Sequence, residues 1–230
     1  MIAILSGLIA GAGHVWAGPD HLAAIAPLAV RHPRRSWLPG LRWGIGHSAG
    51  VAAIGILSLM LRELLPVDLL SSWGERLVGV MLIGIGLWGM KRALRNTVHA
   101  HEHEHGGDRH VHIHVHSHSG RHEAASAHQH THAAFGIGIL HGLAGSSHLL
   151  GILPMLAFPT QAMALTYLAA FAGGTVISMA GFSWIMGYAA RRAANRGLKL
   201  YRGLMISCSV AAMIVGCMWI AQTFSATAHS

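Results

Sequence analysis

Residues 13–22 read Gly-His-Val-Trp-Ala-Gly-Pro-Asp-His-Leu, and they lie inside an apolar segment that runs from about residue 2 to residue 30. A helix of about 20 apolar residues crosses a lipid bilayer. Ionisable side chains at that depth are costly, so they usually mark the path of an ion or a substrate. Imidazole and carboxylate groups together suit a divalent transition metal. The stretch therefore predicts a metal site inside a membrane protein, with His14, Asp20 and His21 as candidate ligands.

The spacing of the two histidines adds a condition to this prediction. His14 and His21 are close to two helical turns apart, so a straight helix would separate them by about 10 Å at 1.5 Å per residue. Metal–nitrogen bonds are near 2 Å, and one ion could not reach both. Proline removes a backbone donor and clashes with the preceding turn, so we expect the helix to break near Gly18-Pro19. Asp20 is either a ligand or an acceptor that orients an imidazole.

Composition places most of the chain in lipid. Of the 230 residues, 53% are hydrophobic and only 10% are charged, whereas a soluble domain has about 25% charged residues. The formal net charge of +8 does not indicate nucleic-acid binding, because the basic residues lie between apolar segments rather than in one stripe with aromatic residues. The two cysteines, Cys208 and Cys217, share one apolar segment without a redox or zinc spacing, and we interpret them as packing residues.

Six apolar segments are long enough to cross a bilayer, which predicts an all-α integral membrane protein. Basic residues gather in the loops after the first, third and fifth segments, whereas the other two loops are mixed or uncharged. Because positive loops stay in the cytoplasm, we expect these three loops to be cytoplasmic and both termini to lie outside. The six predicted spans are residues 2–30, 41–61, 73–93, 133–157, 161–189 and 198–224.

The two halves of the chain share the motif H-x-x-A-G-x-x-H-L-x-x-I-x-P at an offset of 127 positions. A three-span unit repeated once reverses its orientation. Inverted repeats are a common plan among transporters, with sites near the membrane midplane. We therefore expect two inverted three-helix repeats, residues 1–95 and 133–230, joined by residues 96–132.

Three further histidines within predicted spans are candidate ligands. His47 lies early in the second span, and His141 and His148 occupy the repeat-equivalent positions of His14 and His21. Serines stand where the first half has Pro19-Asp20, so the second half lacks the carboxylate and the two half-sites should differ.

Residues 96–132 differ in kind from the spans. Their composition cannot bury a core, so we expect a disordered cytoplasmic loop. The alternation His-x-His recurs along the loop, and His-rich tracts bind metals; a solvated linker without metal is the alternative. The loop histidines considered as weak metal-binding candidates are His99, His101, His103, His105, His110, His112, His114, His116 and His118.

Three motifs, at residues 14–22, 46–48 and 140–146, resemble those of the nickel/cobalt transporter superfamily, in particular its UreH-type urease accessory membrane proteins. In the permeases of that superfamily an H-x4-D-H signature recognises the metal. The resemblance places this signature on His14, Asp20 and His21, with five residues rather than four between His14 and Asp20, and places the second motif on His47. It implies an integral protein of a bacterial inner membrane that moves Ni²⁺ or Co²⁺ as its substrate ion.

We therefore expect Ni²⁺ or Co²⁺ transport, with uptake for maturation of a nickel enzyme such as urease as the favoured direction. A related exporter branch also carries a His-rich loop, so efflux is an alternative, as is a membrane accessory that binds metal without moving it. An enzyme is not expected, because no serine, cysteine or carboxylate pair is arranged for nucleophilic or acid–base work. The expected partners are a divalent metal ion, the lipid bilayer and cytoplasmic metallochaperones, with no nucleic acid and no covalently bound cofactor.

Overall fold

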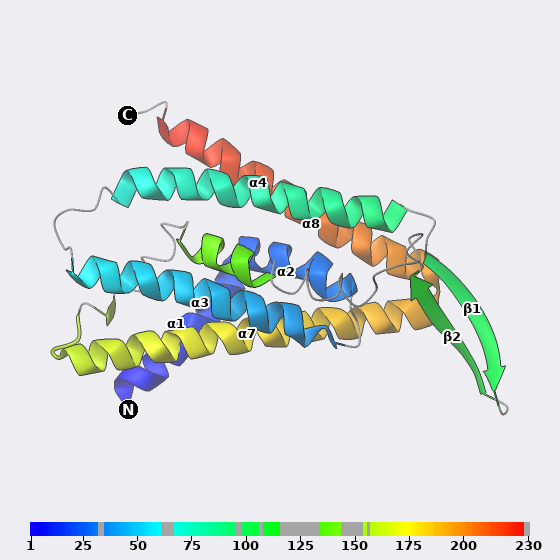
Figure 1. The fold of residues 1–230 in the computed structure, drawn as a ribbon, viewed down its shortest axis with the longest axis horizontal. Helices are drawn as coiled ribbons and strands as arrows, with labels where there is room; N and C mark the ends of the chain where they lie inside the picture. The colour runs from blue at the N-terminus through cyan, green and yellow to red at the C-terminus, as the bar shows by residue number, and fades with distance from the viewer. Residues whose placement is uncertain are drawn as a thin grey trace.

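The structure is a computed structural model, and it describes residues 1–31, 35–60, 67–94, 98–105, 108–115, 134–143, 154–155 and 157–227. Within these residues, long helices lie side by side and an antiparallel hairpin extends from one end of the array (Figure 1). The elements are α1 (Ile2–Ala17), α2 (Pro19–Arg31), α3 (Trp37–Met60), α4 (Val67–Leu94), β1 (Val98–His105), β2 (Asp108–Val115), the short helix Ala134–Leu143, α7 (Gln161–Arg196) and α8 (Leu198–Thr227).

The predicted break in the first helix is confirmed. α1 ends at Ala17, α2 begins at Pro19, and the two helices are bent by 74°. Gly18 closes α1 by donating its backbone N–H to the carbonyl of His14, 3.1 Å away. Proline favours the first position of a helix, because its missing N–H would have had no intrahelical partner there, so Pro19 starts α2 at the point where α1 must stop.

The structure supports a helical membrane protein. Three of the helices in the described residues are long and apolar enough to cross a membrane: Arg76–Leu94, Gln161–Arg196 and Leu198–Thr223. The bent pair α1–α2 makes a fourth if it is counted as one span. Within the described residues, the helix Ala134–Leu143 is shorter than the length that crosses a bilayer. The larger count of six spans in two inverted repeats therefore stays a prediction.

Helix pairs in the array are packed through glycine. α4 lies along α8, and both α1 and α3 pack on α7. A Cβ atom at Gly11 of α1 would meet the backbone oxygen of Phe171 in α7, and a Cβ at Gly138 would meet the backbone oxygen of Trp43 in α3. Small residues at such crossings let two backbones approach closely, which is how helices associate in lipid. These contacts hold α1 against α7, and the helix Ala134–Leu143 against α3.

The hairpin differs from the disorder predicted for residues 96–132. β1 and β2 pair antiparallel over their full length, from Val98 opposite Val115 to His105 opposite Asp108. The alternating sequence has the period of two that suits a strand, and a hairpin satisfies backbone hydrogen bonds between its own strands. The helical prediction holds for the described elements outside this hairpin, and the rest of 96–132 lies outside the described residues.

Candidate metal centre

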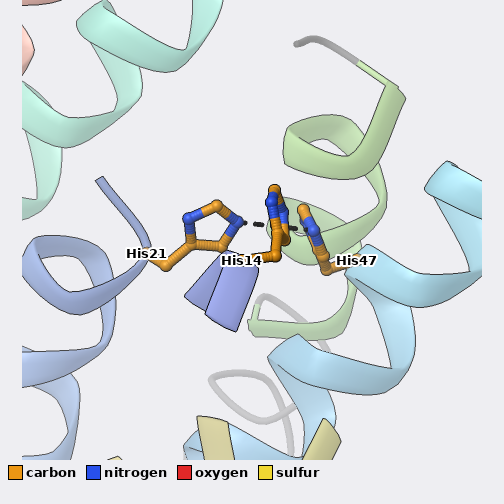
Figure 2. A group of neighbouring side chains, drawn as sticks. All are labelled: His14, His21 and His47. Atoms are coloured by element: carbon orange, nitrogen blue, oxygen red, sulfur yellow. Dashed lines mark hydrogen bonds between the residues drawn. The ribbon is translucent and has the colours of Figure 1, made fainter. Parts of the chain in front are cut away.

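Three imidazoles converge from α1, α2 and α3, as Figure 2 shows for His14, His21 and His47. Their ligand nitrogens all lie within 4.8 Å of one another, and Nε2 of His21 lies 3.4 Å from Nε2 of His47. Two nitrogens bound to one tetrahedral ion at about 2.05 Å lie roughly 3.4 Å apart. The pair therefore already has the separation that a shared ion needs.

The bend between α1 and α2 accounts for this convergence. The ring centroids of His14 and His21 lie 4.6 Å apart, where a straight helix would have separated the residues by about 10 Å of rise. His14 sits in the last turn of α1 and His21 in the first turn of α2. The interrupted helix thus presents both rings to the side chain of His47.

A second group of ligand atoms adjoins the first and shares His21 with it. Asp20, His21 and His141 also place one ligand atom each within 4.8 Å of the others. Oδ1 of Asp20 lies 3.0 Å from Nδ1 of His21, and Oδ2 lies 3.2 Å from Nε2 of His141. The exposed fractions are 3% for Asp20, 1% for His21, and 0% for His47 and His141. Five ionisable side chains are thus gathered in or beside a region that water does not reach.

The contacts of His21 define the roles of its two nitrogens. A carboxylate can only accept, so the bond at 3.0 Å requires Nδ1–H of His21 to donate to Asp20. In the neutral ring this leaves the lone pair on Nε2, the atom that faces His47. A carboxylate behind the imidazole fixes the tautomer and makes the ring a better ligand. Asp20 also lies in the first turn of α2, where the helix dipole stabilises negative charge.

Several residues that enclose the centre were missed by the sequence reasoning. Trp43 is fully buried, and its ring lies 5.9 Å from that of His141. It precedes His47 by one helical turn and so shares a face with it, a spacing that could have revealed it. Phe171 on α7 lies 5.5 Å from the ring of His14, and no local pattern pointed to it. Gly18, which the sequence already marks as the helix break, has no space for a side chain, because a Cβ atom there would overlap Nδ1 of His21.

The structure places the predicted ligands at the centre, on the hairpin or outside the described residues. The structure brings together His14, Asp20, His21, His47 and His141, and His148 lies outside the described residues. Among the loop histidines, His116 and His118 also lie outside them. The others lie on the hairpin strands: His99, His101, His103 and His105 on β1, and His110, His112 and His114 on β2.

The family model described as "Cytochrome C biogenesis protein transmembrane region" matches residues 3–211. The chain belongs to this family. Both cysteines of this member are on α8, and both are free, with Cys208 buried and Cys217 exposed.

Three curated relatives are similar to this family member. The Arabidopsis thaliana proteins named Chloroplast protein FOR GROWTH AND FERTILITY 1 and 2 are 33% and 31% identical, over 79% and 95% of this chain. The alignments cover 48% and 56% of those proteins, so the chain spans about half of their length. Urease accessory protein UreH of Bacillus sp. (strain TB-90) is 28% identical over 81% of this chain and 77% of its own. No solved structure matches the chain.

The relation to UreH confirms the family resemblance predicted from the three motifs. The names of the relatives denote accessory or growth-related proteins rather than enzymes, in line with the membrane family that matches the chain.

Proposed function

We propose that this protein moves a divalent transition metal, Ni²⁺ or Co²⁺, across a membrane through the centre formed by His14, Asp20, His21, His47 and His141. One observation carries the proposal: imidazole nitrogens from α1, α2 and α3 lie within 4.8 Å of one another around a broken helix. Imidazole and carboxylate ligands suit nickel and cobalt. The names of the chloroplast relatives mention no metal, although these proteins align with much of the chain. The proposal of nickel as the ion therefore rests on the similarity to UreH and on the shared motifs.

Charge supports transit of a cation rather than permanent storage. Neutral imidazoles add no charge, and among the described residues that meet at the centre Asp20 is the one carboxylate. A divalent ion there keeps a net positive charge, which limits how tightly a buried site holds it. Moderate affinity is what a site needs if an ion is both to enter and to leave.

Paired glycine contacts support the predicted inverted repeat. Gly11 approaches the backbone of α7 at Phe171, and Gly138, which lies 127 positions later, approaches the backbone of α3 at Trp43. The pairings α1 with α7 and Ala134–Leu143 with α3 are those expected if the two halves are related by a two-fold axis in the membrane plane. His148, which corresponds to His21 at the same offset in the sequence, is a proposed sixth ligand.

The hairpin is the proposed collector of cytoplasmic metal. The hairpin extends from one end of the array, whereas the N-terminus and the C-terminal end of α8 lie at the other end (Figure 1). The basic loops indicate that the end with the hairpin faces the cytoplasm. Its register pairs histidine with histidine at three positions: His99 with His114, His101 with His112, and His103 with His110. Residues directly opposite in antiparallel strands have Cβ atoms about 4.5–5.5 Å apart, close enough for two imidazoles to bind one ion.

The direction we propose is uptake into the cytoplasm of a bacterial cell, where the hairpin would retain arriving ions and pass them to metallochaperones. Export with the same centre is the alternative. A second alternative is a membrane accessory that binds metal without transporting it. A thiol electron carrier of similar span count is a third alternative, but two cysteines nine positions apart, one buried and one exposed, do not form the pair that dithiol exchange needs.

Radioactive nickel accumulation in cells tests the proposal. Cells that express the protein should accumulate more ⁶³Ni²⁺ than cells without it, and His21→Ala and His47→Ala should abolish the gain at unchanged protein level. His229→Ala is the matched control, since that histidine lies beyond α8. A fall in cell nickel on expression would establish export, and unchanged accumulation in both centre variants would overturn the transport proposal.

A further inference from the structure

A groove of about 650 Å³ lies between α7 and α8, near the turn that joins them. Its walls are two stripes with helical spacing. Tyr188, Arg192 and Arg196 follow one another at intervals of four residues on α7, and Lys199, Gly203 and Ser207 do so on α8. The remaining lining residues are small or aliphatic: Ala189, Ala193, Leu200 and Leu204.

Charge in the groove is concentrated at one end. Arg196 is the last residue of α7 and Lys199 the second residue of α8, so both flank the turn, and Arg192 lies one helical turn deeper. Among the described residues that line the groove, none is acidic. The first turn of α8 also faces it through Lys199 and Leu200, and backbone N–H groups at a helix start attract anions. The mouth of the groove therefore suits a phosphate group.

The deeper part of the groove is apolar and lies along helices that are candidate membrane spans. Tyr188, two helical turns before the end of α7, remains 43% exposed, and Leu200 beside the mouth remains 49% exposed. The Nε–H of Arg192 donates to the hydroxyl of Tyr188 at 2.9 Å, and its guanidinium lies 5.3 Å from the centre of the Tyr188 ring. These contacts hold the arginine at the border between the charged mouth and the apolar floor.

We propose that this groove is a binding site for an anionic phospholipid, with the phosphate at Arg192, Arg196 and Lys199 and an acyl chain along Ala189, Ala193 and Leu204. The order of charge above apolar surface matches the order of headgroup above chain in a bilayer leaflet. Basic pockets between membrane helices bind such headgroups in the cytoplasmic leaflet, the side on which we place this turn. The site is independent of the metal centre.

The test measures thermal unfolding of the purified full-length protein in detergent, with added phosphatidylglycerol, phosphatidylcholine or inorganic phosphate. Phosphatidylglycerol should raise the Tm by roughly 5 °C at saturation, and the other two additives should not. The triple variant Arg192→Gln, Arg196→Gln, Lys199→Gln should lose the shift. The matched control Arg35→Gln, Arg42→Gln, Lys91→Gln removes the same charge from predicted cytoplasmic positions that do not line the groove and should keep it.

Three outcomes would overturn the proposal. Equal shifts in both triple variants would mean general attraction between a basic protein and an acidic lipid. An equal shift with inorganic phosphate would mean a free-anion site without a lipid chain, and an equal shift with phosphatidylcholine would mean that charge plays no part. If the groove triple does not fold, the single variant Arg196→Gln, set against Arg35→Gln, gives the same comparison by native mass spectrometry of lipid-bound protein.

Discussion

Oδ2 of Asp20 lies 3.2 Å from Nε2 of His141, and this contact joins the two halves of the chain at the buried centre. Asp20 belongs to the first turn of α2, and His141 belongs to the helix Ala134–Leu143. The second half has serines where the first half has Pro19-Asp20, so one carboxylate serves histidines from both halves. The halves are therefore unequal in chemistry even where their sequences correspond.

Asp20→Asn should weaken the centre without changing its shape. The amide keeps the size of the side chain but loses the charge that offsets a cation and that orients His21 and His141. Loss of a carboxylate behind a metal-binding imidazole costs about 10–100-fold in metal affinity. Nickel binding to the purified protein, measured by isothermal titration calorimetry, should show this loss, and wild-type affinity in the variant would contradict the role given to Asp20.

Gly18→Ala should damage the centre although glycine carries no ligand. The added methyl group would overlap Nδ1 of His21 and crowd Oδ1 of Asp20, and overpacking of this kind costs about 1–3 kcal/mol. We expect nickel accumulation to fall about tenfold, with a lower Tm.

Gly13→Ala is the matched control for this change, because a Cβ at Gly13 meets nothing within 4 Å. It should keep wild-type accumulation. If the two alanine variants behaved alike, the close approach of Gly18 to His21 would have no part in function.

Removal of the hairpin should separate transport from retention. Replacement of residues 98–115 by a flexible Gly/Ser linker removes the three cross-strand histidine pairs and leaves the centre untouched. The initial rate of nickel uptake should stay within about twofold of wild type, because the linker carries no ligand of the centre. The number of ions bound per purified protein, measured by equilibrium dialysis, should fall. Loss of the initial uptake rate would favour the accessory alternative.

The double variant Cys208→Ala, Cys217→Ala tests the thiol alternative. The cysteines are free and lie on α8, and neither belongs to the two groups of ligand atoms. Nickel accumulation should be unchanged, with a small loss of stability from the cavity at buried Cys208 of roughly 1 kcal/mol. A loss of function in this variant would indicate electron transfer instead of metal transport.

The local part of the centre was predictable from sequence, because it depends on chain chemistry within a few residues. Gly18-Pro19 predicted the bend, and the bend follows from a missing donor at Pro19. The distant partners were not predictable in the same way. The aromatic ring that contacts His14 is set by how α1 crosses α7, and no motif around Phe171 indicates this contact. The composition of the histidine-rich segment predicts disorder, whereas its alternation has the period of a strand, and the paired register of β1 and β2 follows that period.

His21 belongs to both groups of ligand atoms, and this limits how many ions the centre can hold at once. An ion bound with His14 and His47 occupies the same imidazole that an ion beside Asp20 and His141 would require. In the proposed transport, ions would therefore occupy the centre one at a time, each displacing the last from His21. The rate of uptake should depend hyperbolically on metal concentration, with a Hill coefficient of about one, and nickel and cobalt should compete for a single binding site.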